Sequence, residues 1–197
     1  ADRTESFLSD CHGRDHVTHA ELAVKNDGTF LGFKNETIAN IGAYASVFAT
    51  VTPTYLFGPC ATGVYKMPAA YTNVKAVFTN TAPVDAYRGA GRPEATYTIE
   101  TLVEKAAREL GMDPADIRMK NFPTQFPFQQ TLVHSVDSGD YVQGLNKAME
   151  IADYKGFEKR KRESASNGKL RGIGLCTYFE ACGIAPSPVV MMLGCGI

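Results

Sequence analysis

Hydrophobic and polar residues alternate over residues 17–24, and this period of two predicts a β-strand. The dipeptide Asp27-Gly28 then favours a tight turn, because glycine adopts a positive φ at no steric cost. Residues 29–33 can return antiparallel to the first strand, so a hairpin is predicted. The alternation recurs over residues 74–79, which predicts a further strand.

A helical period follows over residues 95–110, where apolar side chains recur every three or four positions. Pro93 suits the first turn of this helix, because its missing N–H would have no partner there, and Gly111 can end the helix in a left-handed conformation. Asp113 is a favourable cap for a second helix, which we expect to reach about Asn121. Two further helices are expected, over residues 140–152 and 154–164.

The remaining segments have the composition of loops, apart from one apolar run. Residues 38–46 are mostly small and apolar, and proline and glycine punctuate residues 53–71, so no regular structure is predicted for either segment. The run 173–179 is most simply a buried strand. Together these elements predict an α+β fold, in which hairpins and short mixed strands pack beside several helices.

Composition and charge narrow the functional classes. The 197 residues have a net charge of −1 with acidic and basic residues mixed, which argues against the basic face of a nucleic-acid-binding protein. No stretch approaches the roughly 18 apolar residues of a membrane span. The five cysteines form an odd set without close pairing, which favours reduced thiols and a cytoplasmic location. Because the chain starts without Met and stops after an apolar run, we expect a piece of a longer protein.

One constellation can bind a ligand, namely Arg88-Gly89-Ala90-Gly91 running into the helix at Pro93. Glycines let the backbone approach a ligand, and the unpaired N–H groups at a helix start favour oxyanions. Arg88 and the following Arg92 would add positive charge. The spacing matches neither the dinucleotide-binding fingerprint nor a P-loop, so a structural turn and a binding loop remain equally compatible with it.

Two other clusters carry chemistry-bearing side chains without the geometry for a site. A strand at residues 17–24 sends the neighbouring His16 and His19 to opposite faces, so no metal site is predicted there, even with Cys11, His12 and Asp15 nearby. The polar loop at 134–137 contains His, Ser and Asp but no nucleophile elbow, so no catalytic triad is predicted. The basic run at 159–162 is interpreted as a solvated helix end.

The segments around the glycine-containing loop closely resemble the large, molybdopterin-binding subunit of molybdenum hydroxylases, the group of xanthine dehydrogenase, aldehyde oxidase and carbon monoxide dehydrogenase. The sharpest matches are residues 79–95, 100–110 and 113–121, and weaker matches are residues 2–7, 14–16, 40–44 and 172–174. The resemblance implies a partial molybdopterin-binding domain over residues 1–197. Within it we expect a strand-rich part at 1–80, the cofactor loop and helices at 81–168, and the start of a further strand region at 169–197.

The resemblance also implies which residues contact the cofactor and which residue faces the substrate. Arg88, through its backbone, with Gly89 and Gly91 would contact molybdenum-molybdopterin in its cytosine dinucleotide form, and Ala90 would face the substrate. The expected chemistry is hydroxylation with water-derived oxygen, with electrons leaving through 2Fe-2S clusters and FAD. These sit on an iron-sulfur small subunit and an FAD-binding medium subunit, in a dimer of heterotrimers. No segment matches the family's general-base glutamate or its upstream glutamine motif, so no catalytic residue is predicted here and this chain alone should be inactive.

The residue after Arg88 distinguishes branches of this group. Carbon monoxide dehydrogenases proper have a cysteine there, which holds a copper ion bridged to molybdenum, whereas this chain has Gly89. The sequence is more similar to the branch called carbon monoxide dehydrogenase form II, for which we expect aldehydes or N-heterocycles as substrates. Carbon monoxide oxidation, a non-catalytic scaffold domain with the same fold and a plain anion-binding module are the alternatives.

Overall fold

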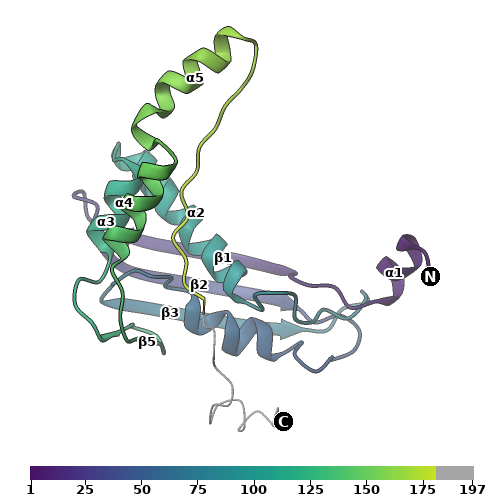
Figure 1. Ribbon diagram of the computed structural model, residues 1–197. Helices are drawn as coiled ribbons and strands as arrows, with labels where there is room; N and C mark the ends of the chain where they lie inside the picture. Colours follow the sequence, from purple (N-terminus) through teal and green to yellow (C-terminus); the bar gives the residue numbers. More distant parts are fainter. Residues whose placement is uncertain (181–197) are drawn as a thin grey trace.

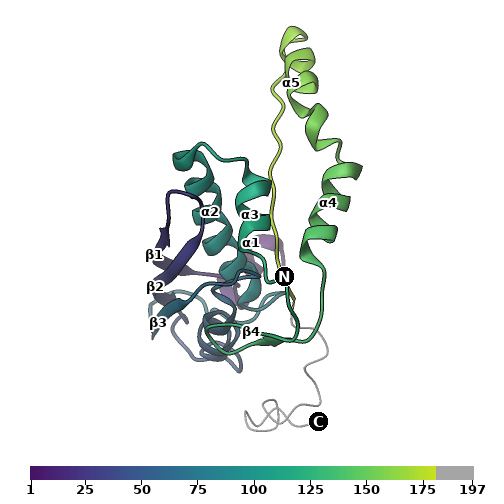
Figure 2. The same cartoon turned by 90° about the vertical axis from the view of Figure 1, so that its left-hand side faces the viewer.

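A three-stranded mixed sheet is the base of the fold, and the computed structural model describes residues 1–180 around it (Figure 1). β1 (His16–Val24) pairs antiparallel with β2 (Phe30–Asn40), and β2 pairs parallel with β3 (Ala69–Val77). Helices α2 (Arg92–Leu110) and α3 (Pro114–Asn121) lie together on one side of this sheet (Figure 2). The expected α+β fold with mixed strands is therefore confirmed.

The predicted hairpin is confirmed, but its second strand is longer than predicted. β2 continues to Asn40, whereas the pattern predicted a return strand only over residues 29–33. The reason is that polar side chains occupy its inward face, where Asn35 and Thr37 are buried, while Ile38 points outward and is 51% exposed. A strand with polar residues inside and an apolar residue outside does not produce the usual hydrophobic alternation.

The parallel pairing of β2 and β3 requires a crossover, formed by residues 41–68. The prediction of no regular structure for residues 53–71 was wrong in part, because two short helical turns, η1 (Thr52–Leu56) and η2 (Gly58–Cys60), form there. Residues 69–71 moreover belong to β3, which begins five residues before the strand predicted over 74–79. Phe57 and Tyr65 are almost fully buried in this crossover. The crossover is thus a packed part of the core, although its prolines and glycines suggest a surface loop.

The predicted helices are confirmed, and their ends follow from capping. α2 ends at Gly111, which has a φ of 66°, and the Asp113 side chain accepts a hydrogen bond from the Ala115 N–H at the start of α3.

No helix in the described part of the chain is long and apolar enough to cross a membrane. The other helices are α1 (Arg3–Ser9), α4 (Tyr141–Ile151), η3 (Tyr154–Gly156) and α5 (Phe157–Ser166).

The main core lies between the sheet and the helices α2 and α3. Asn121, at the end of α3, is 1% exposed and fixes the hairpin turn, because its Oδ1 accepts from the Phe30 N–H and its Nδ2 donates to the Gly28 carbonyl. This places the start of β2 against α3. The buried apolar residues of this core include Phe30, Phe33, Tyr65, Ile99, Val103, Ile117 and Phe122.

Helices α4 and α5 extend away from the sheet, and the chain then runs back toward it as an extended segment, residues 169–180 (Figures 1 and 2). The prediction of a buried strand at 173–179 was wrong: these residues pair with no strand within residues 1–180, and Ile173 is 39% exposed. Leu175 and Phe179 nevertheless pack against the core. Residues 181–197, which include the rest of the expected strand region, lie outside the described residues.

The loop after α3 contains a small hairpin that the sequence did not predict. β4 (Phe128–Gln129) pairs antiparallel with β5 (Ser135–Val136). Gln130, just after β4, is buried and its side-chain amide donates a hydrogen bond to the Gly63 carbonyl of the crossover. The hairpin is therefore fixed to the same crossover that passes beneath α2.

Candidate functional site

The segment of residues 87–91, hereafter the glycine loop, has an unusual backbone immediately before α2. Gly89, Ala90 and Gly91 have φ values of 97°, 37° and 86°, so three successive residues lie in the left-handed region. Ala90 is notable because a side chain disfavours this conformation. Such strain persists only where surrounding contacts hold it, and it concentrates at functional sites.

Contacts with the crossover explain why position 91 is glycine. Gly91 is buried, and a Cβ built on it would lie 2.6 Å from the Phe57 backbone nitrogen and 2.7 Å from the Thr52 carbonyl oxygen. Both are backbone atoms, so they cannot move aside as a flexible side chain would. Gly91 therefore lets the glycine loop lie directly on η1.

Position 89 is glycine for a different reason. A Cβ on Gly89 would lie 2.6 Å from Cγ and 2.8 Å from Cδ of Pro93, in the first turn of α2. The positive φ of Gly89 adds a second penalty for any side chain. The proline that starts the helix thus keeps the loop surface bare at position 89.

Two arginines fix the carbonyl groups of the loop. Arg14 donates from Nη2 to the Arg88 carbonyl at 2.5 Å, and Arg92 donates from Nη1 to the carbonyls of Gly89 at 3.1 Å and Ala90 at 3.3 Å. Three successive carbonyls are therefore held by guanidinium groups. Within residues 1–180, the N–H groups of Gly89 and Gly91 make no hydrogen bond. Backbone N–H groups without a partner favour an anionic ligand, although the Ala90 N–H between these two donates to the Tyr87 carbonyl.

Arg14 is a site residue that sequence reasoning did not identify, since it was noted only as part of a weakly matching flank. It has a φ of 61°, and its guanidinium lies 4.7 Å from the centre of the Tyr87 ring. Its Nε also lies 3.5 Å from a carboxylate oxygen of Glu94. Arg14 and Arg88 are 74 residues apart, so no local motif could reveal the contact.

The sequence predicted that the side chains of Arg88 and Arg92 would both add positive charge near a bound anion, but the two side chains lie in different surroundings. Arg92 has a side chain only 12% exposed, which lies between the loop carbonyls and Glu180, with Nε 2.7 Å from the Glu180 carboxylate. The Arg88 side chain is exposed and makes no hydrogen bond or ion pair within the described residues. Of the two guanidinium groups, that of Arg88 is the one at the protein surface.

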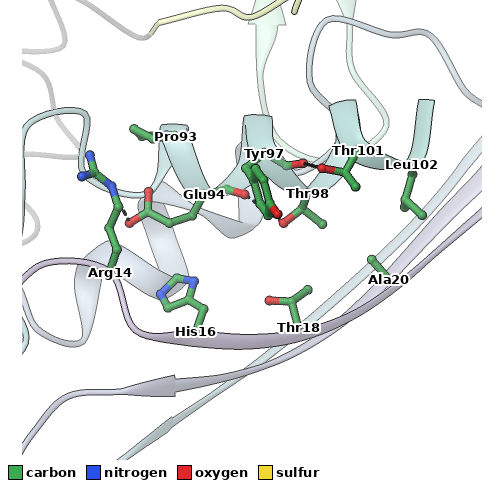
Figure 3. A pocket seen from close by; sticks show the side chains of 10 residues that line it. All are labelled: Arg14, His16, Thr18, Ala20, Pro93, Glu94, Tyr97, Thr98, Thr101 and Leu102. Atoms are coloured by element: carbon green, nitrogen blue, oxygen red, sulfur yellow. Dashed lines mark hydrogen bonds and ion pairs between the residues drawn. The ribbon is translucent and has the colours of Figure 1, made fainter. Parts of the chain in front are cut away.

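A groove of about 810 Å³ runs between β1 and α2 and ends at Arg14 (Figure 3). Thr18 and Tyr97 line its middle, and His16 and Glu94 lie close to Arg14 at one end. One atom of each of these two, His16 Nδ1 and Glu94 Oε2, is buried without a hydrogen-bond partner. Burial lowers the pKa of His16, against the opposing effect of the nearby carboxylates, so a neutral imidazole faces the groove.

The structure also shows the surroundings of the histidines in the two other candidate clusters. His16 and His19 lie on opposite faces of β1, as predicted, and no group of three or more metal-ligating side chains occurs among the described residues. The ring of His134 contacts the thiol of Cys60, with 3.3 Å between Nε2 and Sγ, a pair that the sequence did not indicate. Burial raises the pKa of Cys60 to about 11, so the group is a thiol and not a reactive thiolate.

Residues 1–122 match the molybdopterin cofactor-binding domain family. The chain is 38% identical to the carbon monoxide dehydrogenase large chain of Hydrogenophaga pseudoflava, over 100% of this chain and 25% of that protein. It is 33% identical to the 6-hydroxypseudooxynicotine dehydrogenase complex subunit gamma of Paenarthrobacter nicotinovorans, over 93% of this chain and 24% of that subunit. The chain thus spans about a quarter of the length of these curated relatives.

A solved structure has the same fold. The crystal structure of quinoline 2-oxidoreductase from Pseudomonas putida 86 superposes on 85% of this chain and 22% of its own, with a TM-score of 0.79 and 34% sequence identity. The similarity therefore extends from the sequence to the fold.

Proposed function

The chain belongs to the molybdopterin cofactor-binding domain family of molybdenum hydroxylase large subunits, and from this premise we propose its function. It is part of the catalytic subunit of an oxidoreductase that hydroxylates an aldehyde or an N-heterocycle. When bound, the molybdenum-molybdopterin group, in its cytosine dinucleotide form, supplies the two-electron oxidation that adds water-derived oxygen to an electron-poor carbon. This chain's own residues hold and orient the reactants.

The glycine loop is the observation that carries this proposal. Its carbonyls are held by Arg14 and Arg92, and the N–H groups of Gly89 and Gly91 remain without partners among the described residues, which fits an anionic, oxygen-rich group. We assign the backbone of Arg88, with Gly89 and Gly91, to cofactor contact. Ala90, between the two glycines and half-buried, is assigned to the substrate side.

The bare position at Gly89 supports the substrate class. A cysteine there, as the copper-containing branch requires, would place its Cβ 2.6 Å from the Pro93 ring and would have to keep a φ of 97°. The local structure therefore opposes a copper-holding thiolate at this position. Hydroxylation of an aldehyde or N-heterocycle needs no such ligand, and one similar structure is that of a quinoline 2-oxidoreductase.

Electron transfer and proton abstraction need more than this chain. We propose an FAD-binding medium subunit and an iron-sulfur small subunit with 2Fe-2S clusters as partners, in a dimer of heterotrimers. The similarity to a subunit of a dehydrogenase complex supports a multi-subunit assembly. We assign no general base within residues 1–180. Turnover therefore requires the rest of the large subunit.

Elemental analysis of the intact assembly, purified from its native host, tests this function. We expect molybdenum and iron without copper, together with oxidation of an aldehyde or N-heterocycle panel. Copper equal to molybdenum would instead support carbon monoxide oxidation, in spite of Gly89. Absence of molybdenum would overturn the proposal and leave a scaffold domain, and phosphate binding at the loop without molybdenum would indicate a plain anion-binding module.

A further inference from the structure

Two arginine–glutamate pairs, Arg14–Glu94 and Arg92–Glu180, surround the glycine loop and are hereafter the loop ion pairs. We propose that Glu94 and Glu180 are positioning residues, which act through the two arginines to hold the loop carbonyls and so set the direction of the loop N–H groups. This inference rests on the proposed function, because it assigns a role at the same cofactor loop. It adds two carboxylates that neither touch the loop backbone nor stand within residues 87–91.

The first pair comes from the segment before β1 and the first turn of α2. Glu94 has a side chain only 9% exposed, whereas the Arg14 side chain is 33% exposed. One Glu94 oxygen lies 3.5 Å from Arg14 Nε, and Arg14 Nη2 reaches the Arg88 carbonyl from the same guanidinium plane. Because this plane is rigid, a carboxylate that holds Nε also fixes the direction of Nη2.

The second pair joins α2 to the extended segment 169–180. Glu180 lies 2.7 Å from Arg92 Nε, on the edge of the guanidinium away from Nη1, which donates to the carbonyls of Gly89 and Ala90. Two contacts hold this segment a few residues earlier: Arg118 Nη2 donates to the Leu175 carbonyl, and the Thr177 N–H donates to Glu100. Glu180 is therefore delivered to Arg92 by a segment that is itself fixed to the core.

The strained backbone explains why the loop needs such support. Ala90, with a φ of 37°, costs free energy that local hydrogen bonds do not return, whereas Gly89 and Gly91 adopt their positive φ without that penalty. Within the loop only the Ala90 N–H to Tyr87 carbonyl bond and the Arg92 N–H to Gly89 carbonyl bond close the turn. If Arg14 or Arg92 lost its carboxylate, its guanidinium could turn toward water, and the loop carbonyls would lose their donors.

Hydrogen–deuterium exchange of the intact subunit tests this without relying on activity. The variants are Glu94→Gln and Glu180→Gln, and the control is Glu109→Gln, an exposed glutamate at the far end of α2. We expect the Ala90 and Arg92 amides to exchange about 10- to 100-fold faster in both variants, as the loss of an ion pair that orients a loop-binding arginine predicts. Amides at 99–107 should exchange as in the control.

A second measurement on the same proteins reports on the bound group. We expect molybdenum content to stay within about twofold of wild type, while the electron paramagnetic resonance spectrum of the reduced metal changes and kcat/KM falls about 10-fold or more. Arg14→Lys should behave like Glu94→Gln, because an ammonium group cannot contact the carboxylate and the carbonyl in one fixed plane.

The outcomes separate this inference from the proposed function. Wild-type subunit without molybdenum would overturn the proposed function, yet faster exchange at Ala90 and Arg92 would still support the loop ion pairs as positioning residues. Exchange equal to that of the Glu109→Gln control would overturn the positioning role, even in a fully active enzyme. Equal acceleration at 99–107 would also overturn it, because the carboxylates would then act on general stability.

Discussion

Arginine–glutamate pairs form two clusters in this molecule, which differ in burial and in the regularity of the backbone that they contact. In the core, Arg118 of α3 pairs with Glu100 of α2 at 3.0 Å, and the Arg118 side chain is 0% exposed. At the glycine loop, Arg14–Glu94 and Arg92–Glu180 are partly exposed and surround a strained backbone. The core pair joins regular helices, whereas the loop ion pairs hold a segment that would otherwise relax.

Hydrogen bonding separates the two clusters further. Glu100 accepts bonds from Arg118, from the Tyr65 hydroxyl and from both the N–H and the hydroxyl of Thr177. Burial and then the Glu100 carboxylate raise the pKa of Tyr65, so its hydroxyl stays protonated and donates. Beside the loop, by contrast, Glu94 Oε2 has no partner among the described residues. The core cluster is fully hydrogen-bonded and stabilises the fold, whereas the loop cluster keeps one unpaired carboxylate oxygen buried beside the groove.

The largest expected effect is loss of the core pair. Arg118→Met leaves the Glu100 carboxylate buried without its cation, and we expect a destabilisation of about 3 to 5 kcal/mol. Denaturation of the intact subunit measures it, with the exposed Arg108→Met on α2 as control. A midpoint for Arg118→Met equal to that of the control would remove the distinction between the two clusters.

The next effect concerns the contact of the loop with the crossover. Gly91→Ala places a methyl group 2.6 to 2.7 Å from backbone atoms of residues 52–57 at a φ of 86°, which should cost about 3 kcal/mol and lower molybdenum content. Gly144→Ala, in α4 with no atom within 4 Å of the new methyl, should instead stabilise by about 0.5 to 1 kcal/mol. Equal results for the two glycines would contradict the close packing at Gly91.

A smaller loss of stability, about 2 kcal/mol, is expected when a side chain is introduced at position 89. Gly89→Val directs a side chain into the Pro93 ring and should lower molybdenum occupancy of the intact subunit. Adding Pro93→Ala removes the ring and should restore part of the occupancy, although the positive φ of residue 89 remains unfavourable. No recovery in the double variant would show that the backbone conformation, and not the proline, keeps position 89 bare.

The smallest effect is a pH dependence near the groove. Because burial lowers the folded-state pKa of His16 below its usual 6.5, the unfolded chain binds the proton more readily. Stability should therefore fall as the pH drops from above 6.5 through the folded-state pKa. His16→Gln should reduce this loss, which denaturation curves at several pH values would measure. Burial also lowers the pKa of His134, so we expect this residue to account for the pH dependence that remains in His16→Gln.

The elements that the sequence predicted are those whose signals are local. Pro93, Gly111 and Asp113 act on the residues beside them, so the bounds of α2 and α3 followed from the pattern. β2 was underestimated because its inward residues are the polar Asn35 and Thr37. Here tertiary packing decides the structure, and no hydrophobic period reports it.

The same distinction explains the wrong prediction for residues 173–179. Their period of two is real, since Leu175, Thr177 and Phe179 are the half-buried positions. The backbone, however, bonds to the side chains of Arg118 and Glu100 instead of to a neighbouring strand. Period alone reports which side chains are covered, not what accepts and donates the backbone hydrogen bonds.

For the site, the loop itself was visible in the sequence and its supports were not. Glycines before a helix suggested close approach to a ligand, but did not distinguish a binding loop from a turn. The decisive residues, Arg14 and Glu180, lie far from Arg88 and Arg92 in the chain. Arg14 belongs to the segment before β1 and Glu180 to segment 169–180, and only the folded structure brings these two segments to the loop.

The position of Glu180 has a consequence during synthesis of the chain. A ribosome adds roughly 5 to 20 residues per second, so Glu180 is made about 4 to 18 s after Arg92, which lies 88 residues earlier. Throughout that interval the nascent loop lacks one of its two carboxylates. If the loop ion pairs position the loop as proposed, its final form is reached only after the sheet and α2 have had time to fold.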